Sequence, residues 1–175
     1  MGGMVLMQRG MKDKRYKKTE EKMLSVFFVY PDFTMRQLAK KAGVGRSTAY
    51  FHHSSVRRIV PDCEKYVLIE YRRVFKKDAD IKKIFFDLLI FVLKNRRFFE
   101  LFLKFNDREV LIKMLFFLKP FFRGSEKCFR IYVAEVTEVV FEWGRGGFSE
   151  DKISAVLSDI MYLTRTAYDR LSPIR

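Results

Sequence analysis

The chain has 175 residues, of which 49% are hydrophobic, and its 35 Lys and Arg against 21 Asp and Glu give a formal net charge of +14 at pH 7. A chain of this length and apolar content can bury one or two small cores, so a largely disordered protein is excluded. Charged residues interrupt every apolar run well before the roughly 20 residues of a membrane helix, which excludes a transmembrane segment. The two cysteines, Cys63 and Cys128, show no C-x-x-C spacing, so we expect neither a zinc signature nor a disulfide framework, and a cytoplasmic location.

The basic excess lies mainly in the first part of the chain. Residues 1–76 hold 17 basic and 7 acidic residues, whereas residues 77–175 hold 18 and 14. Lys and Arg that neutralise phosphates release condensed counterions, so a protein with this charge is expected to bind DNA with a steep dependence on salt. The alternative is that the basic surface serves solubility alone.

The first expected segments are a flexible basic arm over residues 1–16 and a helix that begins after Thr19 and ends at Tyr30. The helix has an apolar face at helical spacing, and Pro31 and Asp32 form the turn after it. That face consists of Met23, Leu24, Phe27 and Phe28. The basic residues of this region either reach a neighbouring DNA groove or belong to a solvated tail. They are Lys12, Lys14, Arg15, Lys17 and Lys18.

The stretch from Phe33 to His52 has the sequence FTMRQLAKKAGVGRSTAYFH and predicts two short helices joined by a tight turn. Thr34, with Gln37 three residues later, forms a capping box that begins the first helix. Gly43 ends this helix in a left-handed conformation, and a second helix follows from Arg46 to His52. The apolar face of the first helix consists of Met35, Leu38, Ala39 and Ala42. This pattern is typical of a DNA-reading helix-turn-helix, whose second helix enters the major groove.

Residues 34–53 resemble the TetR (tetracycline-repressor-like) family of transcription regulators, whose pattern is roughly T-x-R-x-I-A-x-x-A-G-V-S-x-x-T-L-Y-x-H-F. Here the residues are T-M-R-Q-L-A-K-K-A-G-V-G-R-S-T-A-Y-F-H-H, an ungapped match over about twenty positions. The departures from the family pattern are Gly45 for Ser, Ala49 for Leu, His53 for Phe, and Val56 for a phosphate-contacting Lys. Arg57 and Arg58 lie next to Val56 and are the candidates to replace that contact.

The resemblance implies that these two helices carry the DNA contacts. Arg36 and Arg46 are the candidates for base contact, because the guanidinium fork matches O6 and N7 of guanine; a phosphate contact is the alternative for each. The family would place Tyr50 and His52 on phosphates. Alternatively, Tyr50 or Phe51 packs on a thymine methyl group. A third interpretation makes Tyr50 a half-buried packing residue. The candidate DNA-binding residues are Thr34, Arg36, Arg46, Ser47, Thr48, Tyr50, Phe51, His52 and Arg57.

The two adjacent histidines, His52 and His53, are expected to diverge on a helix. No Cys or carboxylate stands at ligand spacing from them, so the sequence predicts no metal site and no cofactor. His53 is expected to be a partly buried structural residue, since the family packs Phe at that position.

The rest of the sequence predicts helices and no strand, which gives an all-α fold of about nine helices. A helix from Ser54 or Ser55 to about Lys77 contains Pro61, which predicts either a kink or a helix that restarts with Pro61 in its first turn. Five further helices are expected, over 78 or 80 to 94, 95–105, 106–119, 125–143 and 149–171. The first is begun by Asp78 or Asp80, the third by Asn106 with Glu109, the fourth by Ser125 and the fifth by Ser149. The predicted domains are a three-helix, helix-turn-helix domain over 17–54 and a larger helical domain over 55–175.

The family resemblance implies that the larger domain dimerises through its last two helices and binds a small effector. Trp143, Gly147 and Phe148, between those helices, also resemble the family. The aromatic residues in the middle of the chain predict either plain core or a pocket for a hydrophobic ligand. The candidate pocket residues are Phe86, Phe91, Phe99, Phe102, Phe117 and Trp143. The apolar residues suited to a four-helix dimer interface are Ile131, Val136, Val139, Val140, Ile153, Val156, Leu157, Ile160 and Leu163.

The sequence thus favours a dimeric, sequence-specific transcription regulator that binds a palindromic operator, expected to be a repressor released by a small hydrophobic effector. The alternative is an architectural or accessory DNA-binding protein without an effector. An enzyme is not expected, because the sequence shows no nucleophile with a base at usable spacing, no glycine-rich phosphate loop and no paired carboxylates in an apolar setting.

Overall fold

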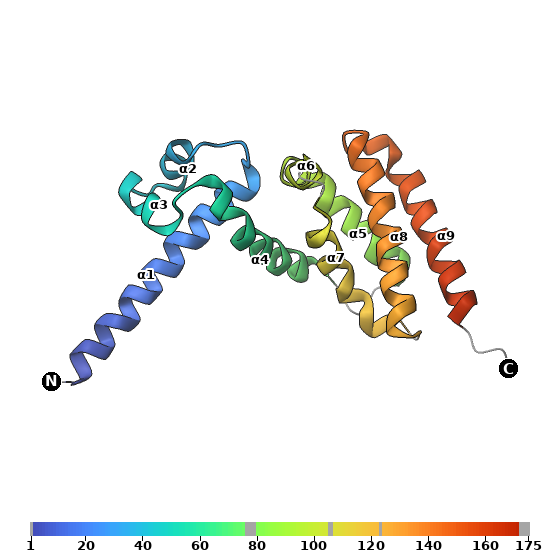
Figure 1. Ribbon diagram of the computed structural model, residues 1–175, viewed down its shortest axis with the longest axis horizontal. Helices are drawn as coiled ribbons and strands as arrows, with labels where there is room; N and C mark the ends of the chain where they lie inside the picture. Colours follow the sequence, from blue (N-terminus) through green and yellow to red (C-terminus); the bar gives the residue numbers. More distant parts are fainter. Residues whose placement is uncertain (1, 76–79, 105–106, 123, 172–175) are drawn as a thin grey trace. The chain divides into compact units, whose positions relative to one another are not determined.

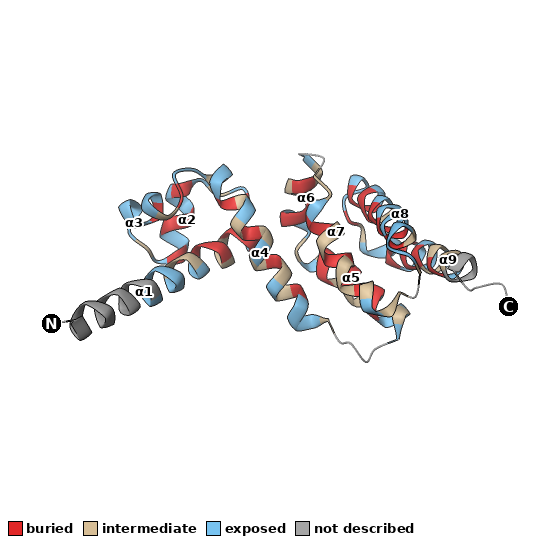
Figure 2. Cartoon of the chain, turned by 60° about the horizontal axis from the view of Figure 1, so that its bottom comes forward, coloured by how far each residue is buried: buried red, intermediate tan, exposed pale blue. Residues whose placement is uncertain are grey.

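The computed structural model describes residues 2–75, 80–104, 107–122 and 124–171. Over these residues it contains nine α-helices, two short 3-10 helices and no strand (Figure 1), which confirms the all-α prediction. The chain forms two compact units, Met1–Val67 and Leu68–Arg175. Buried and exposed positions alternate along the helices at helical spacing (Figure 2), so each helix turns one side toward a core.

The first unit opens with α1, Gly2–Val29, which begins well before the start after Thr19 that the sequence predicts. The residues expected to form a flexible arm are the first turns of this helix. Residues 11–29 contain neither proline nor glycine, so nothing in that stretch interrupts a helix. Met23 and Phe27, four residues apart, are fully buried, as predicted for the apolar face.

The next two helices, α2 (Met35–Ala42) and α3 (Arg46–His52), have the predicted bounds. The Thr34 backbone N–H donates to Gln37 Oε1 at 2.9 Å and Thr34 Oγ1 accepts from the Gln37 N–H at 3.4 Å, so the predicted capping box is present. Gly43 has φ +66°, a left-handed conformation that glycine adopts without a Cβ penalty. Ala49 of α3 is fully buried, so α3 turns its opposite side to solvent.

Helix α4, Val56–Val74, runs through the boundary between the units. Pro61 lies inside this helix and not in its first turn, so the helix does not restart there. Cys63, which is fully buried, lies 3.9 Å through Sγ from the Leu24 carbonyl oxygen, and Phe28 packs edge-on against Tyr66. These contacts join α1 to the first half of α4.

The second unit contains the remaining helices in chain order. They are α5 (Ile81–Lys94), α6 (Arg96–Lys104), α7 (Glu109–Leu115), η1 (Phe116–Phe121), α8 (Glu126–Arg145), η2 (Glu150–Lys152) and α9 (Ile153–Leu171). Asp80 caps α5 and Ser125 caps α8, as predicted, since their side chains accept hydrogen bonds from first-turn N–H groups. Asp78 and Asn106 lie outside the described residues.

Helix α7 is shorter than the predicted helix that ends near Lys119. It ends at Leu115 and continues as the 3-10 helix η1, which contains Pro120. Pro120 has no N–H to donate to the carbonyl oxygen of Phe116, four residues earlier, and its ring crowds that carbonyl, which disfavours continuation of the α-helix. At its start the Glu109 N–H donates to Asp107 Oδ1 at 2.9 Å.

The core of the second unit lies where α8 packs along α9 and where α5 packs on α9. Tyr132 Oη and Thr164 Oγ1 are 2.7 Å apart in this core, and Thr164 donates to the Ile160 carbonyl oxygen at 2.7 Å. Because Thr164 gives its proton to Ile160, Tyr132 is the donor in the first bond, and the pair fixes the register between α8 and α9. None of the helices in the described part of the chain combines the length and the hydropathy that a membrane crossing requires.

Candidate nucleic-acid interface

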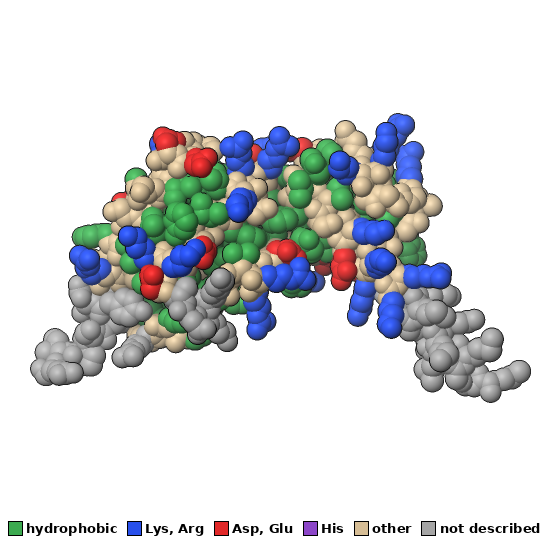
Figure 3. Space-filling view, turned by 180° about the vertical axis from the view of Figure 1, so that it is seen from behind, with side chains coloured by type: hydrophobic (Ala, Val, Ile, Leu, Met, Phe, Trp, Pro, Cys, Tyr) green, Lys and Arg blue, Asp and Glu red, His purple; other side chains and the backbone are tan. Residues whose placement is uncertain are grey.

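All Lys and Arg side chains described in the first unit are exposed to solvent. They lie on α1, on α2, at the start of α3 and in the first part of α4. These residues are Lys14, Arg15, Lys17, Lys18, Lys22, Arg36, Lys40, Lys41, Arg46, Arg57, Arg58 and Lys65. Figure 3 shows that Lys and Arg side chains project into solvent over much of the face that it draws. An exposed basic surface of this kind attracts polyanions.

Arg46 is the first residue of α3 and is exposed. Its guanidinium carbon lies 5.7 Å from the centroid of the Tyr50 ring, one turn along the helix. Tyr50 is 42% exposed, so part of its ring packs on the protein and part faces solvent. The stacked ring limits the orientations of the guanidinium and leaves its donors available to a partner.

Phe51 is the most exposed of the large hydrophobic side chains described, with 78% of its surface open to solvent. Its ring meets Tyr16 of α1 edge-on, at a centroid distance of 6.3 Å. An apolar ring in this position gains free energy when a partner covers it, at about 25 cal/mol per Å² of apolar surface removed from water. Among the residues of α3 it is therefore the strongest candidate for apolar contact with a ligand.

The other predicted contact residues of α2 and α3 occupy different surroundings. Arg36, Ser47 and Thr48 are exposed and available to a partner. Thr34 is exposed, and its hydroxyl also takes part in the capping box.

His52 is half-buried beneath Tyr16, whose ring stacks on the imidazole at 3.9 Å and an interplanar angle of 23°. Burial lowers the pKa of His52 below its ordinary value of 6.5, and its Nδ1 has no hydrogen-bond partner. Sequence reasoning missed this cover, because Tyr16 lies in the segment predicted to be a flexible arm.

Arg57 and Arg58 are exposed in the first turn of α4, whereas Val56 between them and α3 is half-buried. Both arginines line a hollow at the corner between α3 and α4, together with Tyr50 and Phe51. This places guanidinium groups beside the exposed end of α3, where the sequence predicts a phosphate contact.

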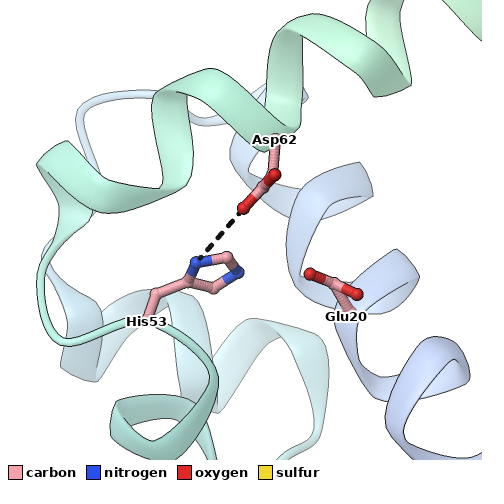
Figure 4. Close-up of side chains that lie close together, drawn as sticks. All are labelled: Glu20, His53 and Asp62. Carbon is pink, nitrogen blue, oxygen red and sulfur yellow. Dashed lines mark ion pairs between the residues drawn. The ribbon is translucent and has the colours of Figure 1, made fainter. Parts of the chain in front are cut away.

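Three residues that are far apart in the sequence meet beneath α3. His53, the C-cap of α3, is 4% exposed; Glu20 comes from α1 and Asp62 from α4, and one ligand atom of each lies within 4.8 Å of the others. His53 Nδ1 is 4.0 Å from Asp62 Oδ2, and Figure 4 shows the other ring nitrogen, Nε2, on the side of Glu20. Nε2 is buried without a hydrogen-bond partner, an arrangement that costs about 1–3 kcal/mol unless something satisfies it.

The resemblance predicts a partly buried His53, and the sequence does not predict this cluster. The three residues of the cluster are not neighbours in the sequence. The packing of α1 against α4 brings the carboxylates of Glu20 and Asp62 to the His53 imidazole.

The six residues predicted to line an effector pocket differ in their burial. Phe91, Phe99, Phe102 and Trp143 are buried, Phe117 is half-buried and Phe86 is 38% exposed. Phe91 packs on Phe99 and on Tyr71, and Tyr71 packs on Phe117, so these rings fill the core. A hollow between α8 and α9 is lined by Trp143 together with Glu138, Val139, Glu142, Gly146, Lys152, Ala155, Val156 and Asp159, and by none of the five phenylalanines.

Most residues predicted for a dimer interface are buried within the single chain. These are Val136, Val140, Ile153, Val156, Leu157 and Ile160. Ile131 is 49% exposed, and Val139 and Leu163 are half-buried. Tyr162 of α9, which the sequence did not suggest, is 69% exposed.

Comparison of the chain with protein-family models, with curated proteins and with solved structures finds no significant match.

Proposed function

We propose that this chain is a sequence-specific DNA-binding transcription regulator that acts as a dimer. The observation that carries the proposal is the solvent face of α3, from which Arg46 and Phe51 project beside the capped helix α2. All basic side chains described in the same unit are exposed. Exposed basic groups supply the sequence-independent attraction to phosphates, and a helix that presents an arginine fork and an apolar ring supplies discrimination between bases.

In this proposal α3 enters the major groove and α2 crosses the sugar-phosphate backbone. Arg46 donates to a guanine, and Phe51 packs on a thymine methyl group. Arg57 and Arg58 take the phosphate contact that Val56 cannot make.

The second unit is proposed to pair two chains, so that two copies of α3 read the half-sites of a palindrome. A small hydrophobic effector that binds the second unit and changes the separation of the two reading helices would lower DNA affinity, which is the behaviour of a repressor released by its ligand.

The test is selection of bound sequences from a random duplex DNA library by the purified full-length protein, followed by titration of the selected sequence at increasing salt. Enrichment of an inverted repeat supports the proposal. Salt-sensitive binding without an enriched sequence favours an architectural protein, and no binding at low salt contradicts both.

The matched control is Lys127→Ala, which removes one exposed positive charge from α8 of the second unit. We expect this variant to select the same sequence with nearly unchanged affinity. A loss equal to that of a variant at Arg46 would mean that net charge alone determines binding.

A further inference from the structure

We propose that Glu20, His53 and Asp62 form a binding site for one divalent transition-metal ion, with Zn²⁺ as the best-suited ion, that links α1 and α4 to the end of α3. The three residues come from three different segments, and all belong to the first unit. The proposal does not depend on the DNA-binding function, because none of the three residues is among the proposed DNA contacts.

The geometry is that of a small site with a buried nitrogen donor. One ligand atom of each residue lies within 4.8 Å of the others, and the His53 side chain is buried, with 4% of its surface exposed. Its Nε2 has no hydrogen-bond partner and lies on the side of Glu20 (Figure 4). A buried ring nitrogen without a hydrogen-bond partner, with two carboxylates beside it, is a donor set that a cation can satisfy.

The chemistry of the donors selects the ion. Imidazole nitrogen with carboxylate oxygens suits Zn²⁺ and its neighbours in the first transition row, whereas Mg²⁺ and Ca²⁺ prefer oxygen ligands alone. Zn–N and Zn–O bonds of about 2.0–2.2 Å place tetrahedral ligand atoms roughly 3.3 Å apart, so the side chains close by about 1.5 Å on binding. Three protein ligands leave one position for water.

The carboxylates are accessible enough to admit an ion and move onto it. The Asp62 side chain is 37% exposed, and Glu20 is half-buried. Lys65 Nζ pairs with Asp62 Oδ1 at 3.1 Å, whereas Oδ2 is the oxygen nearest His53. Because Oδ2 lies on the Nδ1 side of the ring, the Asp62 carboxylate has to turn toward Nε2 to share a metal with it, which its exposure to solvent allows.

The test uses the full-length protein stripped with a chelator and dialysed against Zn²⁺, with bound metal counted by mass spectrometry. We expect one ion per chain, and a rise in Tm by circular dichroism of about 5–10 °C at a hundredfold excess over Kd. Co²⁺ is the second probe, because its visible absorption intensity reports a low-coordinate site with a nitrogen ligand.

The variants are Glu20→Gln and Asp62→Asn, which keep the side-chain shape, and His53→Phe, which keeps an aromatic ring. Loss of a residue that only supports a metal ligand weakens binding by roughly 10–100-fold. Each of these variants loses a ligand and is expected to weaken Zn²⁺ binding by more than that and to abolish the rise in Tm. Glu21→Gln, an exposed neighbour of Glu20 on α1, is the matched control and is expected to bind like the parent chain.

Absence of bound Zn²⁺ at 0.1 mM metal, or equal binding by the parent chain and the Glu20→Gln and Asp62→Asn variants, would overturn the proposal. If His53→Phe does not fold, the two carboxylate variants still decide the question, because they change charge and not volume. DNA enters none of these measurements, so failure of the metal site is distinguishable from failure of the proposed function.

Discussion

At the scale of single residues, we expect Phe51 to have a binding role and Phe98 a packing role. Phe51 on α3 is 78% exposed, whereas Phe98 on α6 is fully buried and packs on Phe102 at a centroid distance of 4.8 Å. We expect Phe51→Ala to change the free energy of unfolding by less than about 0.5 kcal/mol and to weaken DNA binding. Phe98→Ala should cost about 3–5 kcal/mol of stability. Urea unfolding and a DNA-binding titration of both variants check this prediction.

A second prediction at this scale concerns Arg46. Arg46→Ala is expected to weaken binding to the selected DNA site by about 1–3 kcal/mol and to relax preference at one base pair, because it removes a bidentate guanine contact. Repeating the library selection with the variant measures both effects. If affinity for random DNA falls by the same amount, Arg46 contacts phosphate and not a base.

Helical spacing predicted the exposure of Arg36, and the helix-turn-helix pattern predicted that Arg46 and Phe51 face a partner. The partial burial expected for His53 came from the family resemblance and not from spacing. Sequence reasoning did not predict the cover of Tyr16 over His52 or the approach of Glu20 and Asp62 to His53. These contacts depend on the course of α1 and its packing on α4, about which local spacing carries no information.

At the scale of helices, two glycines should respond differently to alanine. Gly43 has φ +66° and open space where a Cβ would lie, so Gly43→Ala should cost about 1–2 kcal/mol from backbone conformation alone. Gly144 lies inside α8, where alanine normally favours the helix, but its Cβ would lie 2.6 Å from Leu103 Cδ1 and 2.7 Å from Phe148 Cζ. Gly144→Ala should therefore destabilise the second unit by about 1–3 kcal/mol. Thermal unfolding of both variants tests this, and a stabilised Gly144→Ala would refute the close contact.

A further prediction at this scale concerns the connection of α7 to α8. Arg108 pairs with Glu138, and its guanidinium lies 4.7 Å from the centroid of the Phe141 ring. The hydrogen bonds from Arg108 lower the pKa of Glu138 below its ordinary value of 4.5. The unfolded chain therefore binds more protons than the native chain just below pH 4.5, so this contribution to stability is present at neutral pH and is lost as the pH falls through the acid range.

Glu138→Gln should remove this part of the pH dependence. The difference in Tm between the parent chain and the variant, measured at pH 7 and again near pH 3, is expected to shrink at the acid pH. Glu135→Gln, on the exposed side of the same helix, is the control. An unchanged difference would show that the pair contributes nothing through ionisation.

Side-chain caps made several helix starts predictable, whereas Ser149, also expected to begin a helix, forms no side-chain cap and precedes the 3-10 helix η2. Thr34, Asp80 and Ser125 mark α2, α5 and α8 as the sequence predicts, since each accepts hydrogen bonds from first-turn N–H groups. The expected beginning of α1 after Thr19 is wrong, because Thr19 instead donates to the Arg15 carbonyl oxygen within a continuous helix.

At the scale of the whole molecule, the proposed dimer depends on apolar groups of α8 and α9 that are exposed among the described side chains. Ile131 and Tyr162 are 49% and 69% exposed. If the last two helices pair two chains, Ile131→Arg should shift the protein toward monomer, because it introduces an unpaired charge into the interface. Light scattering coupled to size exclusion measures the mass, and Val29→Arg, at an exposed apolar position of α1, is the control. A parent chain that is monomeric at high concentration would rule out this mode of pairing.

The overall class was predictable, and the predicted domain boundary and the boundary between the compact units lie at different positions. Helical spacing and the lack of alternating strands predicted an all-α protein. The sequence places a domain boundary between residues 54 and 55, at the start of a helix, whereas the compact units divide between Val67 and Leu68, inside α4. A boundary inside a continuous helix leaves no turn residue to mark it, so composition and spacing cannot locate it.

Trp143 is the only tryptophan of the chain, and it is buried in the second unit, where its indole N–H donates to the Ser149 carbonyl oxygen at 2.8 Å. Intrinsic tryptophan fluorescence therefore reports on that unit alone, while helical circular dichroism reports on both. Any gap between the two melting curves measures how cooperatively the units unfold, without a label or a substitution.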